Sequence, residues 1–134
     1  MRVFAAYQAA VATKDTEAFA ALYDEHVRVF DLWGPWASDG VAARRAMAVD
    51  WLGSPGSARV LVETQDVRIF PADAVATADA FLTYRAVAAD GRELRAMSNR
   101  LTWVLRLVGG AWKIVHEHTS APVEPGTLKA ILKR

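Results

Sequence analysis

The sequence predicts an α+β fold in which a curved antiparallel sheet carries helices on one face. Apolar residues recur with helical spacing through much of the first 52 residues and then alternate with polar residues from Ala58 onward. The dipeptides at 90–91 and 109–110 favour tight hairpin turns between the later strands. We therefore expect a single domain, residues 1–134, with the element order α-α-β-α-β-β-β-β.

The first two helices are predicted from apolar spacing and a capping residue. Phe4, Tyr7 and Val11 lie at i, i+3 and i+7, which places them on one helix face. Asp15 can cap the second helix through its side-chain oxygen. The inward face of that second helix is expected to consist of Phe19, Leu22, Tyr23 and His26.

A strand and a third helix follow before the main sheet. The segment 27–33, "VRVFDLW", is rich in strand-forming residues and is ended by Gly34 and Pro35. Residues 41–52, "VAARRAMAVDWL", form the third predicted helix, capped by Ser38 or Asp39. Its aligned residues are Ala43, Met47 and Trp51.

The strand register predicts which side chains face the core. In "VLVETQDVRIF" the apolar positions change parity near 65–66, which predicts a β-bulge. A two-residue turn at 109–110 pairs the flanking strands so that Trp103 opposes His116 and Leu101 opposes His118. Both histidines then face inward. The predicted outward face holds Arg100, Thr102, Val104, Arg106, Lys113, Val115, Glu117 and Thr119. Extending the register through the turn at 90–91 places Ala78 opposite Trp103.

The composition excludes several function classes. Sixteen basic and 15 acidic side chains give a formal net charge of +1, without the clustered basic patch that nucleic-acid binding needs. The chain has no cysteine, which excludes disulfides and thiolate chemistry. No apolar run approaches the ~20 residues of a membrane span, so no membrane partner is expected and the expected location is cytoplasmic. No phosphate-binding glycine loop is present, and we expect neither a cofactor nor a metal.

Two long segments resemble a known family. They are "VFDLWGPWASDGVAARRAMAVDWL" and "NRLTWVLRLVGGAWKIVHEHTSAPV", and the resemblance extends over residues 3–124. The sequence resembles the SnoaL-like family of the nuclear transport factor 2-like superfamily, whose fold is described as ketosteroid isomerase-like or cystatin-like. This resemblance implies a cone-shaped sheet wrapped around the N-terminal helices, with a pocket at its open mouth. It also implies a homodimer through the outer sheet face, and leaves 125–134 as a short tail or helix.

The resemblance does not supply one activity, because such relatives include isomerases, cyclases, dehydratases and non-catalytic association domains. We expect a small-molecule pocket protein that carries out cofactor-free proton transfer on a hydrophobic substrate. The alternative is a non-catalytic ligand-binding or dimerisation domain. Metal-dependent oxidation is a third and weaker hypothesis. His116, His118 and Asp31 match a 2-His-1-carboxylate metal site in the number of ligands only.

The candidate catalytic residues are polar groups expected at the mouth of the sheet. His118 and Asp31 would be proton acceptor and orienting group, in either order, and Tyr23 or Asn99 a hydrogen-bond donor. Each has an ordinary structural alternative: a turn-forming role for Asp31, and hydrogen bonds that orient the strand end for the histidines, which is favoured for His116. The expected substrate-binding residues are Trp33, Trp36, Trp51, Asn99, Trp103 and His116, with Trp33 and Trp36 as an apolar lip.

Overall fold

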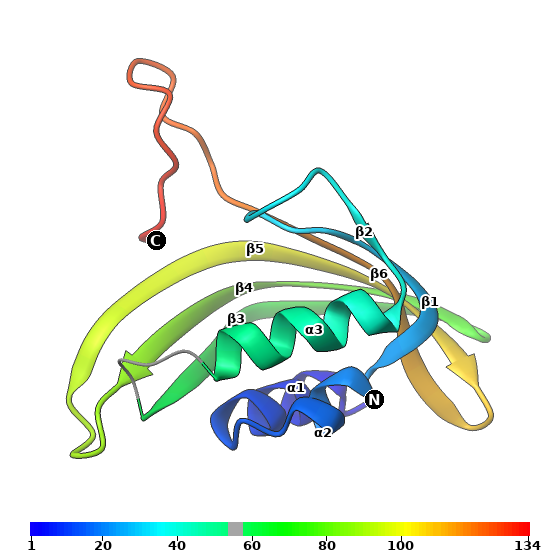
Figure 1. Ribbon diagram of the computed structural model, residues 1–134. Coiled ribbons are helices and arrows are strands. Elements are labelled where there is room, and N and C mark those ends of the chain that lie inside the picture. Colours follow the sequence, from blue (N-terminus) through cyan, green and yellow to red (C-terminus); the bar gives the residue numbers. More distant parts are fainter. Residues whose placement is uncertain (54–57) are drawn as a thin grey trace.

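The structure is a computed structural model that describes residues 1–53 and 58–134. Its helices are α1 (Val3–Ala12), α2 (Thr16–Ala20) and α3 (Val41–Leu52) (Figure 1). Its strands are β1 (Tyr23–Phe30), β2 (Ser38–Asp39), β3 (Arg59–Ala72), β4 (Val75–Val87), β5 (Glu93–Val108) and β6 (Ala111–Ser120). The predicted order is confirmed, with the two-residue strand β2 as an addition. None of the helices in the described part of the chain is long and apolar enough to cross a membrane.

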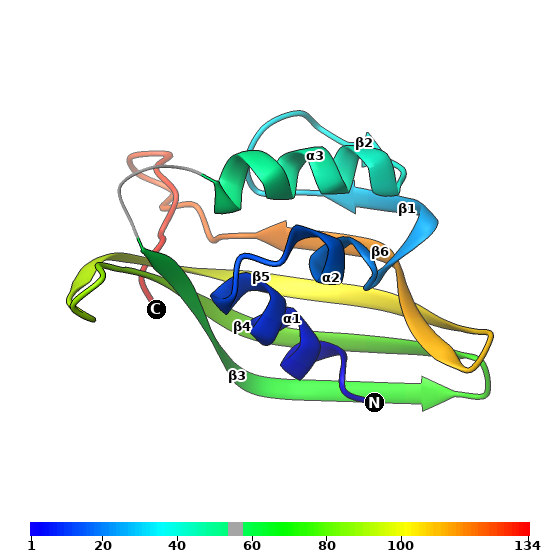
Figure 2. The ribbon, with the colours of Figure 1, turned by 60° about the horizontal axis from the view of Figure 1, so that its bottom comes forward.

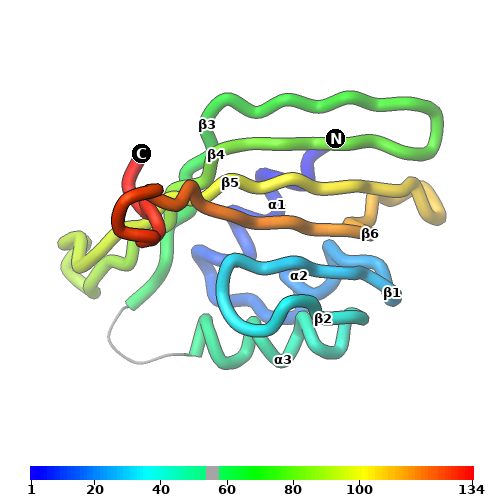
Figure 3. The backbone as a smooth tube through the Cα atoms, turned by 90° about the horizontal axis from the view of Figure 1, so that it is seen from above, coloured from blue at the N-terminus to red at the C-terminus, as the bar shows by residue number. Residues whose placement is uncertain are grey.

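The six strands form one curved sheet in the order β2-β1-β6-β5-β4-β3. Neighbouring strands are antiparallel, except that β1 and β6 run parallel. The sheet does not close on itself, and Figure 3 shows its strands side by side from above. The three helices cover the concave face (Figures 1 and 2), as predicted.

The second helix is shorter than predicted. Asp15 caps it as expected, accepting a hydrogen bond of 2.9 Å from the Ala18 backbone N–H. The helix then stops at Ala20, and the Leu22 carbonyl accepts a hydrogen bond of 2.9 Å from the Ile114 N–H of β6. Pairing with β6 thus overrides the helical spacing, and Tyr23 starts strand β1 instead of continuing the helix.

Helix α3 has the predicted limits but a different cap and a different buried face. Gly40 precedes it with a φ of 90° and no side-chain cap, so the proposed capping roles of Ser38 and Asp39 were wrong. The fully buried residues of this helix are Arg44, Ala48 and Leu52. The predicted row is offset by one position, and this turns Met47 and Trp51 toward the cavity described below.

The register of β3, β4 and β5 follows the prediction. The pairing of β3 with β4 shifts between Gln65 and Arg68, and Asp66 has a φ of 54°, which confirms the bulge. Ala78 lies opposite Trp103, also as predicted. The Trp103 indole is fully buried and packs against the rings of Phe4 and Tyr7.

A second bulge, in β6, was not predicted. Leu105 pairs with Ile114, but Val104, the residue before it on β5, pairs with His116, so Val115 is an extra residue on β6. Because side chains alternate faces along a strand, one extra residue exchanges inward and outward positions from there on. Glu117 and not His116 therefore lies opposite Trp103. The expectation that both histidines face inward was wrong for this reason.

The C-terminal segment turns back on the sheet. Residues 125–134 form no helix, and an isolated bridge pairs Val123 with Ala130. The Ser98 N–H of β5 donates a hydrogen bond of 2.7 Å to the Leu132 carbonyl. This tail, drawn in red in Figure 1, lies beyond the end of β6 and gives Leu132 a place at the cavity.

The turn end of the β5–β6 hairpin provides a matched test of this packing. Leu105 is fully buried, whereas Leu107, two residues along the same strand, is 39% exposed. We expect Leu105→Ala to lower the free energy of unfolding by about 2–5 kcal/mol, because it removes buried methyl groups and leaves a cavity. Leu107→Ala should cost less than ~1 kcal/mol. Urea denaturation of both variants measures the difference, and equal losses would contradict the assigned burial of Leu105.

Candidate functional site

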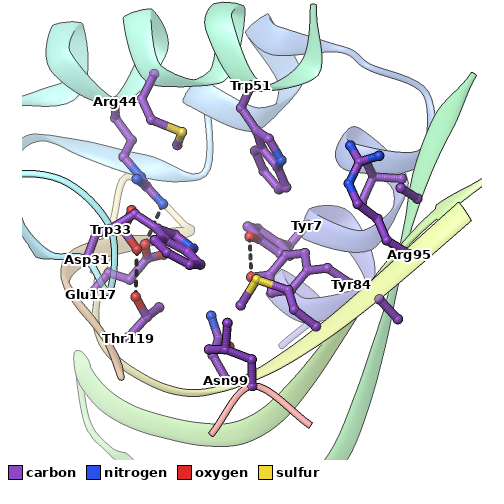
Figure 4. A pocket seen from close by; sticks show the side chains of 16 residues that line it. Tyr7, Asp31, Trp33, Arg44, Trp51, Tyr84, Arg95, Asn99, Glu117 and Thr119 are labelled. Carbon is purple, nitrogen blue, oxygen red and sulfur yellow. Dashed lines mark hydrogen bonds and ion pairs between the residues drawn. The ribbon is translucent and has the colours of Figure 1, made fainter. Parts of the chain in front are cut away.

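Helix α3, the loop after β1, the concave sheet face and the C-terminal tail surround a cavity of about 530 Å³. Its volume lies in the range of small-molecule sites. Four large apolar side chains form walls: Trp33, Met47, Trp51 and Met97. Polar groups face the cavity between them, as Figure 4 shows. The cavity thus combines apolar walls with a few polar groups, as small-molecule sites generally do.

The best-connected of these polar groups is the Glu117 carboxylate, which is 1% exposed. Its Oε1 accepts hydrogen bonds from the Tyr23 hydroxyl at 2.7 Å and from the Trp103 indole Nε1 at 2.9 Å. Its Oε2 forms an ion pair with Arg44 Nη2. A buried charge is tolerated only with such partners, and here both carboxylate oxygens are bonded.

Arg44 reaches the carboxylate from the buried face of α3. Its side chain is 6% exposed, and its guanidinium lies 5.0 Å from the Tyr23 ring centroid and 5.5 Å from that of Phe19. Burial alone would lower the pKa of Arg44, but Tyr23 and Glu117 more than offset this, and the pKa lies above its usual value. The guanidinium is thus firmly charged and ties α3 to the sheet.

Asp31 occupies the end of β1, where the sequence placed it, and its half-buried side chain lines the cavity. The Thr119 hydroxyl donates to Asp31 Oδ1 at 2.7 Å and accepts from the Leu32 N–H at 2.8 Å. Thr119 is therefore committed as a donor to the carboxylate. This arrangement fixes the carboxylate toward the cavity.

Two tyrosines from different elements meet at the cavity wall. The hydroxyls of Tyr7, from α1, and Tyr84, from β4, lie 3.0 Å apart. Burial raises the pKa of Tyr7 well above its usual value. The pKa of Tyr84 is raised too, chiefly by burial, while the hydrogen bond from Tyr7 opposes the rise and the charges of Glu117 and Asp31 add to it. Both phenols are therefore protonated at neutral pH, and the field of Asp31 reaches Tyr84.

Asn99 contributes an amide at the cavity floor, opposite Leu82 of β4. The residue is 8% exposed, and its nitrogen points into the cavity (Figure 4). Its Oδ1 is buried without a hydrogen-bond partner among the described residues. The amide nitrogen that faces the cavity is the donor that this residue offers to a ligand, and the unpaired oxygen is an acceptor.

The structure brings together four of the residues predicted from the sequence. Asp31, Trp33, Trp51 and Asn99 all line the cavity. Trp36 does not, because it lies at the tip of the same loop as Trp33 and is 98% exposed.

Tyr23 and Trp103 lie beneath the cavity and not on its surface. Both are buried, and both donate to Glu117. We expected Trp103 to contact substrate and Tyr23 to reach the pocket mouth. Both instead support the Glu117 carboxylate from below, and Tyr23 points into the core because it begins β1.

The two histidines lie on the convex face of the sheet. His116 is half-buried, and its Nδ1 lies 2.8 Å from the Arg28 carbonyl oxygen. His118 is exposed, and its ring centroid lies 5.6 Å from that of Phe30. The β6 bulge keeps both away from the cavity, so neither occupies the position expected of a substrate-contacting group. The predicted homodimer surface is this same convex face and stays a prediction.

Sequence reasoning missed Glu117, Arg44, Thr119 and the pairing of Tyr7 with Tyr84. Trp103 carried the available signal, because a buried indole N–H requires an acceptor. The predicted register offered His116 for this role, whereas the bulge brings Glu117 there. Arg44 likewise sits in an otherwise apolar helical row with Ala48 and Leu52. The described residues hold no cluster of three or more histidine, aspartate or glutamate side chains that could bind a metal ion.

A curved sheet with helices on its concave face, and a cavity between the two layers, defines an α+β fold of the cystatin-like class. The sequence model of the SnoaL-like domain matches residues 1–124, and the chain belongs to the SnoaL-like family. Among curated proteins, none matches the sequence.

Solved structures agree in fold. A nuclear transport factor 2-like protein of unknown function from Pseudomonas putida superimposes with a TM-score of 0.86 at 24% identity, covering 99% of this chain and 91% of that one. A proposed scytalone dehydratase from Novosphingobium aromaticivorans gives a TM-score of 0.77 at 15% identity, covering 98% and 88%. A proposed calcium/calmodulin-dependent protein kinase II association domain from Xanthomonas campestris gives a TM-score of 0.76 at 18% identity, covering 94% of this chain and 86% of that one. At these identities the likeness shows the cystatin-like fold and no activity.

The buried ion pair can be tested through stability. Removing one partner leaves the other charge buried and unpaired, so Glu117→Leu and Arg44→Met should each lower the free energy of unfolding by about 3–5 kcal/mol. The double variant should recover much of that loss, because no unpaired charge remains. Thermal and urea denaturation provide the measurement, with His118→Leu on the exposed face as control. Additive losses in the double variant would contradict the coupling.

The tyrosines make a separate prediction about pH. The chain has three tyrosines, and the pKa of each is raised. A raised phenol pKa favours the folded state below about pH 10, and that stabilisation is lost as the pH rises above the unfolded value. We expect no tyrosinate absorbance at ~295 nm near pH 10–11 in the native protein, and ordinary titration near 10 in urea. A native tyrosine that titrates near its usual pKa would contradict the assigned burial.

Proposed function

We propose that this protein is a cofactor-free proton-transfer enzyme that acts on a hydrophobic carbonyl compound, with Asp31 as the base. The observation that carries the proposal is the Asp31 carboxylate at one end of a largely apolar cavity that also holds the protonated phenols of Tyr7 and Tyr84. The second carboxylate of the cavity, Glu117, is already paired with Arg44. The relatives described as dehydratase-like share the fold and are consistent with this chemistry. His118 takes no part, because it lies on the opposite face of the sheet.

The reaction follows from the positions of these groups. An Asp31 oxygen removes a proton from the carbon next to the substrate carbonyl, and the C–H electron pair moves into the enolate. The enolate oxygen takes a hydrogen bond from Tyr84, whose hydroxyl proton is free once Tyr7 donates to it. The Asn99 amide N–H supplies a second donor. Asp31 then returns the proton to another carbon of the substrate, which completes an isomerisation with no net gain or loss of atoms.

The surroundings suit this chemistry. Preorganised donors in a cavity with little water stabilise developing negative charge better than water does. The Arg44–Glu117 pair is internally neutral and hydrogen-bonded, so Asp31 is the carboxylate left to react. The hydrogen bond from the Thr119 hydroxyl fixes the orientation of the Asp31 carboxylate.

A non-catalytic binding role is the second candidate, and proton exchange separates the two. We expect the wild type to accelerate hydrogen–deuterium exchange at the acidic CH₂ of 2-tetralone, a flat bicyclic ketone, followed by NMR in D₂O. Asp31→Asn should reduce the enzymatic rate by at least ~100-fold, the usual contribution of a general base. The amide oxygen can still accept the Thr119 hydrogen bond, so the fold should be retained.

Asp39→Asn is the matched control, since Asp39 is an exposed aspartate on the neighbouring strand β2. It should exchange 2-tetralone at the wild-type rate. Unchanged exchange in Asp31→Asn would exclude Asp31 as the base. Binding of 2-tetralone by the wild type without exchange would favour the binding protein.

A further inference from the structure

The cavity holds a second charged group that the proposed reaction does not use. Arg95, on β5, lines the cavity wall alongside Tyr84 and Met97. Figure 4 places it at the side of the cavity away from Asp31, with the tyrosine pair between them. The cavity therefore has an anionic end and a cationic end.

Arg95 has no carboxylate partner within the described ranges 1–53 and 58–134. Glu93, two residues before Arg95 on β5, is already paired with Arg85 at 2.6 Å, and Arg85 also contacts Glu63 at 2.9 Å. Residues 54–57, outside those ranges, are Ser-Pro-Gly-Ser and contain no acidic side chain. Arg95 is thus an exposed cation at the cavity that forms no ion pair with the described residues.

The other charges of the cavity cancel. Arg44 and Glu117 neutralise each other below the surface, which leaves Asp31 and Arg95 as the charges presented to a ligand. An arginine guanidinium matches a planar carboxylate through two parallel hydrogen bonds. A single guanidinium offers one such fork, which suits one carboxylate.

The wall between the two ends selects the rest of the ligand. Two tryptophans and two methionines, Trp33, Trp51, Met47 and Met97, form most of it. Indole faces and thioether sulfurs both make favourable contacts with aromatic rings.

We propose that the ligand is an aromatic carboxylate, with its carboxylate bound by Arg95 and its reacting carbonyl end directed at Asp31. This inference rests on the proposed function for the role of the Asp31 end, but the Arg95 end is testable by binding alone. Arg95 then fixes the direction of the substrate in the cavity, and so fixes which carbon meets the base.

The test compares 2-naphthoate with the nearly isosteric, uncharged 2-naphthamide, using calorimetry and tryptophan fluorescence. The wild type should bind 2-naphthoate about tenfold more tightly than 2-naphthamide, the difference expected for one charge-assisted hydrogen-bonded pair. Arg95→Gln should abolish that preference and leave 2-naphthamide binding unchanged. Arg92→Gln is the matched control, because it removes the same charge from the adjacent turn, outside the cavity lining.

Equal binding of the two probes by the wild type would overturn the proposal, and so would a preference that survives Arg95→Gln. Loss of both probes in Arg95→Gln would overturn it as well, provided that circular dichroism shows the variant folded. Asp31→Asn separates the two proposals, since it should abolish tetralone exchange and keep the naphthoate preference. If the wild type exchanges 2-tetralone but does not prefer 2-naphthoate, only the proposed ligand class is wrong. If it prefers 2-naphthoate but does not exchange 2-tetralone, only the proposed catalytic role is wrong.

Discussion

The buried ion pair between Arg44 and Glu117 is the interaction on which the rest of the site depends. It connects the inner face of α3 to β6, and through Tyr23 it reaches the start of β1. Removing such charges from water costs several kcal/mol per ion, so the pair is sustained only because the hydrogen bonds from Tyr23 and Trp103 satisfy the carboxylate. These requirements fix the distance of α3 from the sheet, and with it the position of the cavity walls.

A single backbone irregularity makes that interaction available. Val115 is the extra residue in β6, and it turns Glu117 and Thr119 inward while His116 and His118 turn outward. Without it, imidazoles would meet Trp103 and the buried guanidinium of Arg44 would have no carboxylate. The bulge therefore decides the chemistry of the cavity, since it replaces two imidazoles with a paired carboxylate and a hydroxyl.

Much of the fold could be read from the sequence because its signals were local. The bulge near Asp66 was marked by a change of apolar parity, and the turns at 90–91 and 109–110 by residues that suit tight turns. The β6 bulge carries no such mark, because Val115 lies within an ordinary strand pattern that is consistent with either register. The limit of α2 was equally hidden, since only pairing of β1 with β6, far along the chain, shows that Tyr23 is not helical. Asp31, Trp33, Trp51 and Asn99 were found because they follow from strand ends and loop positions, whereas Arg44 and Glu117 required knowledge of that distant register.

The same bulge also places two polar side chains of β6, Glu117 and Thr119, on the cavity side of the sheet. Thr119 follows Glu117 on the inward face of β6, and its hydroxyl orients Asp31 at the end of β1. One register shift thus supplies the Glu117 carboxylate, which Arg44 neutralises, and the Thr119 hydroxyl, which orients the Asp31 carboxylate. A base is most effective when its orientation is set before substrate arrives and no nearby charge has to reorganise. In the proposed reaction Glu117 does not compete with Asp31 for the proton, because its carboxylate is already bound by Arg44, Tyr23 and Trp103.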